Sequence, residues 1–403
     1  MKKRLIDMDV RDKKILLRCD FNVPIENGNI LDDSKILAAL DTIEYLINQG
    51  CRIIILSHLG KVKSEEDKKK NTLEPVAKRL KELLKTKVTF SKQCVSPAIK
   101  DAVSSMIPGD VLLLENTRHE DYPEKKESGN DESLSKYWAD LADVFVMDAF
   151  GSAHRCHAST YGVAKLLPNC IGFLVENELK ALDKYVMNPE RPFTVLMGGA
   201  KIDDKLEIIE KLIPNCDNLL LTGCLANTCL RILGFNVGSS VVSKDPDILE
   251  KIKKILVDNK EKIMLPLDVI VTRSYNDEYI NHVNLIDITD DDIIYDIGMK
   301  TIDKYNTAIQ NSKTIFVNGT AGKYEDIKFA NGTRELLDKI SKSDAIKVAG
   351  GGDGVSAVKK FNYGKDFTYL STGGGATLEY IRDGKLAALD AIEEEKVYEI
   401  LDL

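Results

Sequence analysis

Short apolar runs rich in β-branched residues alternate with amphipathic stretches along nearly the whole chain. The runs Lys14–Arg18 and Arg52–Ser57, for example, flank Ser34–Gln49, whose apolar residues recur at helical spacing. Strands that alternate with helices at this interval predict parallel sheets with helices on both faces. The other predicted strands are Lys87–Phe90, Val111–Leu114, Val144–Met147, Phe193–Met197, Asn218–Thr222, Lys262–Leu265, Thr314–Val317, Ala345–Val348 and Tyr369–Leu370. The other predicted helices are Thr72–Leu84, Leu206–Leu212, Thr301–Gln310, Gly332–Lys342 and Gly352–Lys360.

The length of the chain, 403 residues, favours two such domains over one. The predicted join is Val175–Met187, a helix-like stretch that ends before the prolines at 189 and 192. We therefore expect an α/β protein with two doubly wound, parallel-sheet (Rossmann-like) domains, residues 1–174 and 189–389, joined by an interdomain helix at 175–188. The tail has a helical pattern over Leu386–Ile400, and we expect residues 390–403 to pack back onto the first domain.

Cationic and polar side chains follow several strands of the first half. The segment Asp148–Ser159 comes directly after the strand Val144–Met147 and contains two histidines and an arginine. Open α/β sheets bind their ligands beyond the carboxyl ends of the strands. Three other strands end in similar chemistry, at Arg18–Asn22, Ser57–Lys61 and Glu115–Arg118. Because the chain as a whole carries a net charge of -8, this local basic cluster predicts a site for a multiply charged anion.

Composition argues against several other classes of protein. The acidic balance is not typical of a nucleic-acid or membrane-surface binder, and no apolar run reaches the length of a membrane-spanning helix. We expect a cytoplasmic protein. The eight scattered cysteines are expected to be reduced and structural, and His154, Cys156 and His157 have no second ligand pair that would suit zinc. The charge run Ser64–Lys70 is expected to be a solvated loop.

Glycine clusters follow three strands of the second half. They are Gly198–Gly199 followed by Lys201 and Lys205, then Gly350–Gly354, and then Gly373–Gly375. Glycines between a strand and a helix let backbone N–H groups approach an anion, and the helix N-terminus adds its dipole. The spacing of Lys201 and Lys205 predicts that both ammonium groups lie on one helix face. Three such turns in one domain predict a polyphosphate site, whereas neither a Walker motif nor a dinucleotide fingerprint is present.

These motifs resemble those of the phosphoglycerate kinase family, in the family's order and spacing, over essentially the whole chain. The segments that carry the resemblance are Arg18–Pro24, Ser57–Gly60, Leu114–Arg118, Asp148–Arg155, Gly198–Lys205, Asp296–Gly298, Asn318–Gly319, Glu325, Gly350–Asp353 and Ser371–Ala376. The resemblance implies an ATP-dependent phosphotransferase of glycolysis, which moves phosphate between 1,3-bisphosphoglycerate and ADP. It also implies domain closure, Mg²⁺ bound with the nucleotide, small-molecule partners only and a monomer.

The resemblance also implies roles for individual residues. The implied substrate-binding residues are Asp20, Phe21, Asn22, Lys35, His58, Leu59, Gly60, Lys61, Arg118, Arg155 and His157. The implied nucleotide-binding residues are Lys201, Lys205, Asn318, Glu325, Gly350, Gly351, Gly352, Asp353, Thr372 and Gly373. Asp353 would serve the metal, and Lys35, Lys205, Gly352 and Gly374 would act on the transferring phosphoryl group, which needs charge neutralisation more than a protein nucleophile.

Several positions depart from the family pattern. Lys35 stands where the family has an arginine that reaches the transferring phosphate, and Lys61 stands where an arginine follows Ser-His-Leu-Gly. Both changes keep the charge but lose the planar fork that matches phosphate oxygens. Gly354 replaces a hydroxyl residue, and the segments Thr222–Thr228 and Val317–Gly322 differ near the expected base. The alternative is therefore a diverged paralogue that binds nucleotide or phosphoglycerate with low or no turnover, and an oxidoreductase or nucleic-acid binder is a distant third.

Overall fold

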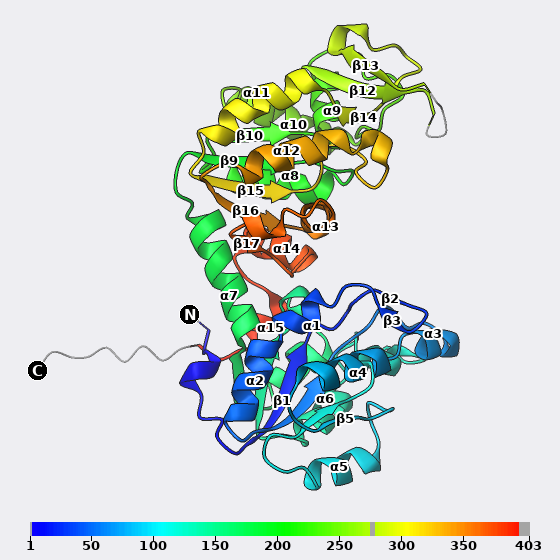
Figure 1. Cartoon of the computed structure of the whole chain (residues 1–403), viewed down its shortest axis with the longest axis vertical. Helices are drawn as coiled ribbons and strands as arrows, with labels where there is room; N and C mark the ends of the chain where they lie inside the picture. Colours follow the sequence, from blue (N-terminus) through cyan, green and yellow to red (C-terminus); the bar gives the residue numbers. More distant parts are fainter. Residues whose placement is uncertain (1, 275–278, 395–403) are drawn as a thin grey trace, which may run out of the picture. The chain divides into compact units, whose positions relative to one another are not determined.

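The computed structural model describes residues 2–274 and 279–394 (Figure 1). The chain divides into two compact units. Unit 1 contains the residues up to Leu179 together with the segment that returns at Asp383, and unit 2 comprises Lys180–Arg382. The returning segment thus starts earlier in the chain than position 390. Helix α7 (Phe173–Leu182) runs across the first boundary and is followed by the π-helical turn η5 (Asp183–Met187).

Unit 1 is built on a six-stranded sheet in the order β5-β6-β4-β1-β7-β8, and every neighbouring pair is parallel. Chain order reverses between β1 and β7, because β4 and β6 continue the sheet on one side of β1 and β8 continues it on the other. Open α/β sheets place ligands at such a switch point. The strands are β1 (Lys14–Cys19), β4 (Arg52–Leu56), β5 (Val88–Phe90), β6 (Val111–Leu113), β7 (Val144–Asp148) and β8 (Asn169–Ile171).

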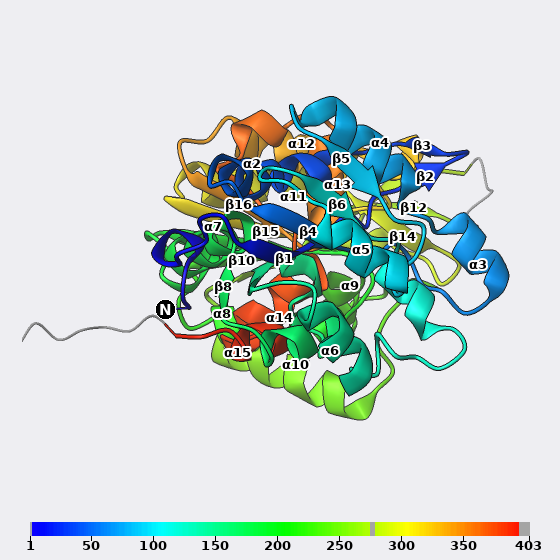
Figure 2. The same ribbon diagram turned by 90° about the horizontal axis from the view of Figure 1, so that it is seen from below.

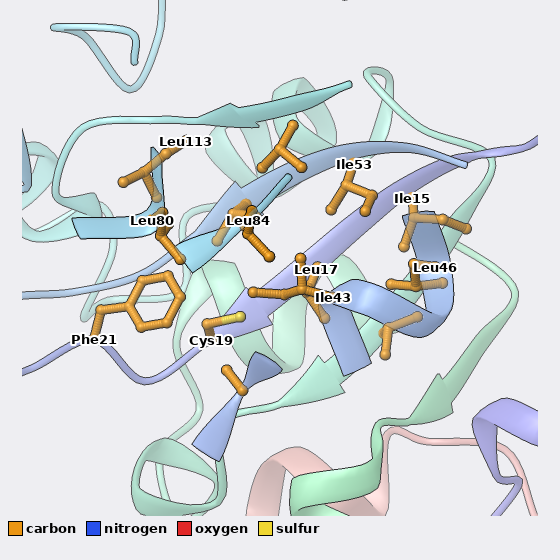
Figure 3. Close-up of a cluster of buried hydrophobic side chains, with 14 of the residues drawn as sticks. Ile15, Leu17, Cys19, Phe21, Ile43, Leu46, Ile53, Leu80, Leu84 and Leu113 are labelled. Atoms are coloured by element: carbon orange, nitrogen blue, oxygen red, sulfur yellow. The ribbon is translucent and has the colours of Figure 1, made fainter. Parts of the chain in front are cut away.

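Helices cover both faces of this sheet. Ile15 and Leu17 point to one face and Leu16 to the other, yet all three are fully buried. Figure 3 shows Leu17 packed with Ile43 of α2 in the core on the first face. Figures 1 and 2 show α2 and α6 on opposite sides of β1, and Figure 2 shows the same for β4. The helices are α1 (Ser34–Ala38), α2 (Leu40–Asn48), α3 (Glu65–Lys70), α4 (Glu74–Leu83), α5 (Pro97–Ser104), α6 (Glu132–Ala139) and α15 (Ala387–Asp390).

Short elements complete unit 1. A two-stranded ribbon, β2 (Ile25–Glu26) and β3 (Asn29–Ile30), follows β1. Short helical turns lie beyond β6 and β7, where the sequence predicts ligand-binding loops. These turns, with the one at the N-terminus, are η1 (Leu5–Asp7), η2 (Thr117–Asp121), η3 (Phe150–Ser152) and η4 (Ala158–Gly162).

Unit 2 contains a second six-stranded parallel sheet, in the order β11-β10-β9-β15-β16-β17. Its switch point lies between β9 and β15, so the loops after these two strands lie side by side. The strands are β9 (Phe193–Met197), β10 (Asn218–Leu221), β11 (Ile263–Met264), β15 (Thr314–Asn318), β16 (Ile346–Gly350) and β17 (Tyr369–Leu370). The helices and short turns are α8 (Asp203–Leu212), α9 (Gly223–Ile232), α10 (Pro246–Asp258), α11 (Met299–Gln310), α12 (Asn331–Ser341), α13 (Gly352–Lys360), α14 (Gly375–Asp383), η6 (Leu285–Asp287), η7 (Ile327–Phe329) and η8 (Gly364–Asp366).

Unit 2 also contains an antiparallel sheet that the sequence patterns did not predict. Its order is β13-β12-β14, with β12 (Asp268–Thr272) between β13 (Asn281–Asn284) and β14 (Ile293–Ile297). The pattern of β13 is polar and largely exposed, and β14 begins with three half-buried residues. Neither strand shows the continuous apolar run that marks a strand buried on both faces.

Three predicted elements differ in the structure. The predicted helix Ser34–Gln49 is two helices, α1 and α2, which meet at Ala39. The predicted loop Ser64–Lys70 contains helix α3, which buries no residue. That helix is stabilised at its ends instead: the Ser64 hydroxyl accepts a hydrogen bond from Asp67 N, with acidic residues in the first turn and basic residues in the last.

The predicted tail helix is short. Helix α15 ends at Asp390, and residues 391–394 are not helical. The tail makes backbone contacts instead: Ala388 N donates to Ala153 O (2.8 Å), and Lys3 N donates to Glu393 O (2.8 Å). The side-chain oxygen of Asn169 accepts from Glu393 N (2.8 Å), which fixes the strand-like end. The rest of the predicted helix, from residue 395 onward, lies outside the described residues.

Candidate functional site

The loop after β1 carries the first group of predicted site residues. The carboxylate of Asp20, which is 7% exposed, accepts a hydrogen bond from Asn22 N (3.1 Å) and pairs with the ammonium of Lys35 (2.9 Å). Burial alone would raise the pKa of Asp20, but Lys35 and other nearby cations outweigh it and hold that pKa below its usual value. Asn22 Oδ1 accepts from Gly60 N (2.9 Å), which joins this loop to the loop after β4.

His58 lies in the loop after β4, against a fully buried arginine. Its Nδ1 is 3.2 Å from Nη2 of Arg18 and 3.5 Å from the hydroxyl of Ser152. Burial lowers the pKa of His58 to about 3; Asp20 opposes this shift and Arg18 adds to it. The imidazole is therefore neutral at physiological pH, and it can contribute a hydrogen bond to an anion but no charge.

Arg118 and His157 are buried cation-capable groups of unit 1. Arg118 is 9% exposed, and its Nη1 donates to Asp121 (2.6 Å). Its Nε is buried and has no hydrogen-bond partner among residues 2–274 and 279–394. His157 is 7% exposed, and burial lowers its pKa to about 3, with nearby arginines adding to the shift. A buried guanidinium nitrogen without a partner is costly, so this part of the structure is suited to an anionic ligand.

Other predicted substrate residues are placed differently. Phe21 and Leu59 belong to the hydrophobic core, so they can face a ligand only through their backbone. Arg155 is exposed, and its Nε contacts His154 Nε2 at 3.1 Å. Lys61 is also exposed, and its carbonyl accepts a hydrogen bond from Asn71 (3.0 Å).

Lys205 is the central cation of the second group of predicted residues. Only 7% of the residue is exposed, and its Nζ donates to Asn318 Oδ1 (2.7 Å) at the end of β15. The amide of Asn318 in turn donates to Gly350 O (2.9 Å) at the end of β16. Burial lowers the pKa of Lys205 to about 8, although Asp353 and Asp204 favour its charged form. A partly desolvated ammonium in this position is suited to bind phosphate.

Lys201 does not share a helix face with Lys205, contrary to the prediction from their spacing. Helix α8 begins at Asp203, so Lys201 precedes it. The side chain of Lys201 is exposed, whereas that of Lys205 is buried. The helix starts late because Gly199 turns the chain with φ +98 directly after β9.

The other two glycine turns have the expected form. Gly351 has φ +82 and caps α13, and Gly374 has φ +53 just before α14. A Cβ on Gly351 would lie 2.5 Å from the amide nitrogen of Asn318, whereas one on Gly352 or Gly374 would meet nothing within 4 Å. Gly351 is therefore needed for the turn itself, and the space beside Gly352 and Gly374 is open to a ligand. Thr372 and Gly373 precede the second turn, where Gly373 N donates to Ser371 Oγ (3.2 Å).

A cavity of about 350 Å³ opens beside the first glycine turn. Its walls are mostly apolar and come from the loop after β9, the start of α9, strand β14 and the loop after β15. Two predicted nucleotide residues, Glu325 and Asp353, lie at this cavity, whereas Gly350–Gly352 and Thr372–Gly373 are not part of its lining. An apolar cavity with a few polar groups is typical of a site that takes a flat, partly apolar ligand group such as a nucleotide base.

Glu325 and Asp353 are both exposed. The Nζ of Lys360, at the end of α13, donates to the carbonyls of Tyr324 (2.9 Å) and Glu325 (3.1 Å), and so ties the turn that carries Glu325 to that helix. At Gly354 a Cβ would lie 3.0 Å from Gly319 N, so the lost side chain at this position would have pointed at the turn after β15.

Sequence reasoning did not include several buried residues in the site. The sequence places Arg18 at a strand end and in the Arg18–Pro24 motif without assigning it a role, and it assigns no role to Glu127, Ser159 or Asn116. The side chain of Asn116 accepts from Leu59 N (3.0 Å) and Arg118 N (3.0 Å), which links two of the site loops. The resemblance covers Asn116 through its Leu114–Arg118 motif. Glu127, in contrast, lies in the charged stretch Glu124–Glu127, which gives no signal of burial.

The comparisons with known proteins identify one family. The model of the family described as phosphoglycerate kinase matches residues 5–385. The phosphoglycerate kinase of Lacticaseibacillus casei (strain BL23) is 46% identical over 391 residues, which cover 96% of this chain and 98% of that protein. That of Enterococcus faecalis (strain ATCC 700802 / V583) is 44% identical over 397 residues, covering 98% of this chain and 100% of that protein.

Solved structures give the same result. The structure of phosphoglycerate kinase from Coxiella burnetii superimposes with a TM-score of 0.84 at 34% identity and covers 97% of this chain and 98% of that one. The phosphoglycerate kinase from Pyrococcus horikoshii OT3 superimposes with a TM-score of 0.82 at 30% identity, covering 96% and 98%. Among the helices of the described residues, none has the length and apolar character needed to cross a membrane.

Proposed function

Because the chain belongs to the phosphoglycerate kinase family, we propose that it transfers a phosphoryl group between 1,3-bisphosphoglycerate and ADP, giving 3-phosphoglycerate and ATP. It is an ATP-dependent carboxyl-group phosphotransferase of glycolysis. The observation that carries the proposal is that each unit has groups suited to an anion beyond the carboxyl ends of its parallel strands. Unit 1 offers buried cationic and imidazole groups, and unit 2 offers glycine turns beside Lys205.

The proposed phosphoglycerate site is in unit 1. Arg118, whose buried Nε has no hydrogen-bond partner in the described part of the chain, would bind the anionic end of the substrate, while His58 and His157 would supply neutral hydrogen bonds. Asp20 and Asn22 would bind the hydroxyl and carboxylate region, and exposed Arg155 and Lys61 would contribute charge from the rim. The burial of Arg118 and the two histidines supports direct contact with the substrate, and the exposure of Arg155 and Lys61 supports a role at the rim.

The proposed nucleotide site is in unit 2. The apolar cavity would take the base, Glu325 at its wall would take the ribose hydroxyls, and Lys205 with Asn318 would lie at the phosphates. The backbone at Gly352 and Gly374 would approach the transferring group, since no atom of the described residues lies within 4 Å of a Cβ placed on either glycine. Transfer requires both substrates to meet, so we propose that the units close during turnover.

The residues of unit 2 also fit a nucleotide-bound Mg²⁺. Asp353 is a single exposed carboxylate in the first turn of α13, at the cavity and close enough to Lys205 to influence its pKa. Magnesium is commonly held by one or two carboxylates together with phosphate oxygens and water. When bound, the ion neutralises charge on the nucleotide phosphates. Asp353 would hold it, and Lys205 would stabilise the charge that remains on the transferring group.

Assay of the purified chain with 3-phosphoglycerate and MgATP, coupled to a reductase that consumes 1,3-bisphosphoglycerate, tests the proposal. We expect turnover that depends on both substrates, and a rate no higher than the buffer blank with every nucleotide would reject it. The alternative of a diverged paralogue that binds these ligands without turnover has no support in the comparisons, and turnover in the same assay would exclude it. We further propose a cytoplasmic monomer that acts on small molecules and on neither nucleic acid nor membrane.

A further inference from the structure

Glu127 is a fully buried carboxylate in unit 1 that has no place in the proposed chemistry. It lies between η2 and α6 and is 0% exposed. Its Oε1 accepts a short hydrogen bond from the hydroxyl of Ser159, and its Oε2 accepts from Ser159 N (2.9 Å). Its own carbonyl accepts from Ala158 N (2.9 Å). All of these contacts are made with the loop that follows β7 and carries Arg155 and His157.

Ser159 links Glu127 to a buried arginine. Arg18, at 0% exposure, donates from Nε to Ser159 Oγ (2.9 Å) and reaches His58 Nδ1 with Nη2 (3.2 Å). Glu127, Ser159, Arg18 and His58 therefore form one chain of hydrogen bonds, called here the buried polar chain. It runs from a carboxylate with no exposure to a half-buried imidazole in the proposed substrate site.

The donor and acceptor roles along the buried polar chain follow from chemistry. A guanidinium has five N–H donors and no acceptor. Ser159 Oγ therefore accepts from Arg18 and directs its own proton to Glu127. His58 Nδ1 must likewise accept from Arg18, so a neutral ring carries its proton on Nε2. The hydroxyl of Ser152, 3.5 Å from Nδ1, can also donate to that atom and does not disturb this arrangement.

The charge of Glu127 needs an explanation of its own. A carboxylate near an anion site weakens the attraction of that site for its ligand. A fully buried carboxylate and a fully buried guanidinium are each costly unless they are paired and hydrogen-bonded. Glu127 and Arg18 are hydrogen-bonded to the same hydroxyl, that of Ser159, so their opposite charges lie close together. Neither side chain is exposed, so neither can contact a ligand directly. The function of Glu127 must therefore lie in what it holds in place.

We propose that Glu127 is a positioning residue for the phosphoglycerate substrate, which acts through Ser159 and Arg18 to hold His58 as an Nε2–H donor and anchors the loop of Arg155 and His157. This inference rests on the proposed function of the site. Glu127 itself makes no contact with substrate in this proposal. Its replacement is expected to weaken the binding of 3-phosphoglycerate but not that of MgATP.

The test is a Glu127→Gln variant, which keeps the shape of the side chain and removes its charge. We expect the KM for 3-phosphoglycerate to rise on the order of tenfold, as when a hydrogen-bonded charge is lost, while the KM for MgATP stays within about twofold. The chain has five histidines, so nitrogen NMR of the full protein labelled in histidine can report each ring. The His58 signal, assigned by its loss in His58→Gln, should show the Nε2–H form in the parent and a mixture of forms in Glu127→Gln.

Two further variants make the result decisive. Ser159→Ala breaks the buried polar chain but leaves both charges, and it should also change the His58 signal; it carries the test if Glu127→Gln does not fold. Leu80→Ala truncates a core residue of the same unit and should lower the melting temperature without changing the His58 signal or the ratio of the two KM values.

An unchanged His58 signal in both Glu127→Gln and Ser159→Ala would overturn the proposal, as would an equal rise of both KM values. If the parent protein shows no turnover, the proposed function fails, but the His58 spectra and the binding of 3-phosphoglycerate measured by calorimetry still decide the role of Glu127.

Discussion

At the scale of single residues, burial has the clearest measurable effect at Lys205. Its pKa is lowered to about 8, first by desolvation, so its charge changes in an accessible pH range. A bound polyphosphate would favour the charged form, because it places negative charge beside the ammonium. Nucleotide binding and protonation of Lys205 are therefore linked.

We predict that the affinity for MgADP falls as the pH rises from 7 to 9.5. Above a pKa of about 8, Lys205 must take up a proton on binding, and the dissociation constant can then rise by up to about tenfold per pH unit. Calorimetry at a series of pH values measures this. Lys205→Ala should bind more weakly at pH 7 but with a flatter pH profile, and an equally steep profile would contradict the assignment.

Titration of Lys205 also changes the folding stability, but in the opposite direction: stability rises with pH where MgADP affinity falls. The ordinary pKa of 10.5 applies to the unfolded chain, which therefore binds more protons than the folded one between about pH 8 and 10.5. The contribution of Lys205 to the free energy of unfolding accordingly increases as the pH rises through this window.

Lys35 is the second residue whose chemistry can be tested singly. Its ammonium makes a point contact with Asp20 (2.9 Å), where the family resemblance leads us to expect an arginine. An arginine that acts on the transferring phosphate can contribute on the order of 10³-fold to phosphoryl transfer, because its fork binds two oxygens at once.

We predict that Lys35→Arg raises kcat by about tenfold or more and leaves the KM for MgATP nearly unchanged. Steady-state kinetics of both substrates measures the effect. Lys63→Arg, at an exposed lysine in the loop after β4, is the matched control and should alter neither constant. A kcat for Lys35→Arg at or below that of the parent would show that the fork is not what limits the rate.

The family motifs predicted individual site residues, whereas their hydrogen-bond partners could be identified only in the structure. Arg118 and His157 were predicted because they follow strands in recognisable motifs. Glu127 could not be predicted, since its partner Ser159 is 32 residues away and Arg18 and Ser159 are 141 residues apart. Such a pairing becomes visible only when the fold brings the end of β1 together with the segments that follow β6 and β7.

At the scale of elements, the parallel strands were predictable because they are buried on both faces. Strands such as β9 have the pattern of five consecutive buried residues, which leaves a continuous apolar run in the sequence. Strand β13 is almost wholly exposed, and β8, Asn169–Ile171, contains only two apolar residues after a polar one, so neither has an apolar run that stands out. Helix α3 was missed because its stability comes from capping and charge at its ends.

The turn between β16 and α13 gives a test at this scale. We predict that Gly351→Ala lowers the free energy of unfolding by about 1–3 kcal/mol, because φ +82 is unfavourable for alanine. Its Cβ would also displace the amide of Asn318 and so disturb the hydrogen bond that holds Lys205. Denaturant unfolding and MgADP binding should therefore both be impaired.

Gly352→Ala is the matched comparison, because it separates an effect on stability from an effect on ligand binding. A Cβ there meets nothing within 4 Å, so stability should change by less than about 1 kcal/mol. The methyl group would still enter the space proposed for the phosphoryl group, so MgADP binding or turnover should fall. Equal stability losses for the two variants would show that the backbone of this turn is not as described.

At the scale of the whole molecule, the proposed function assigns one ligand to each unit. We predict that 3-phosphoglycerate slows amide hydrogen exchange mainly in unit 1, near Asp20, His58 and Arg118, and that MgADP slows it mainly in unit 2, near α8 and α13. Each ligand stabilises the unit that binds it, and local opening there becomes rarer. Exchange measured by mass spectrometry on the full chain tests this, and protection of the same unit by both ligands would contradict it.

The hydrogen bond between Lys3 N and Glu393 O has a consequence for biosynthesis. On the ribosome, the first strands emerge long before their last partner, since all of unit 2 must be synthesised between them. Unit 2 is continuous in the chain, so it can fold while unit 1 still lacks the segment from Asp383 onward. The backbone of Lys2 and Lys3 therefore lacks its partner in the tail until the segment from Asp383 onward has been synthesised, and during that time this edge is open to chaperones.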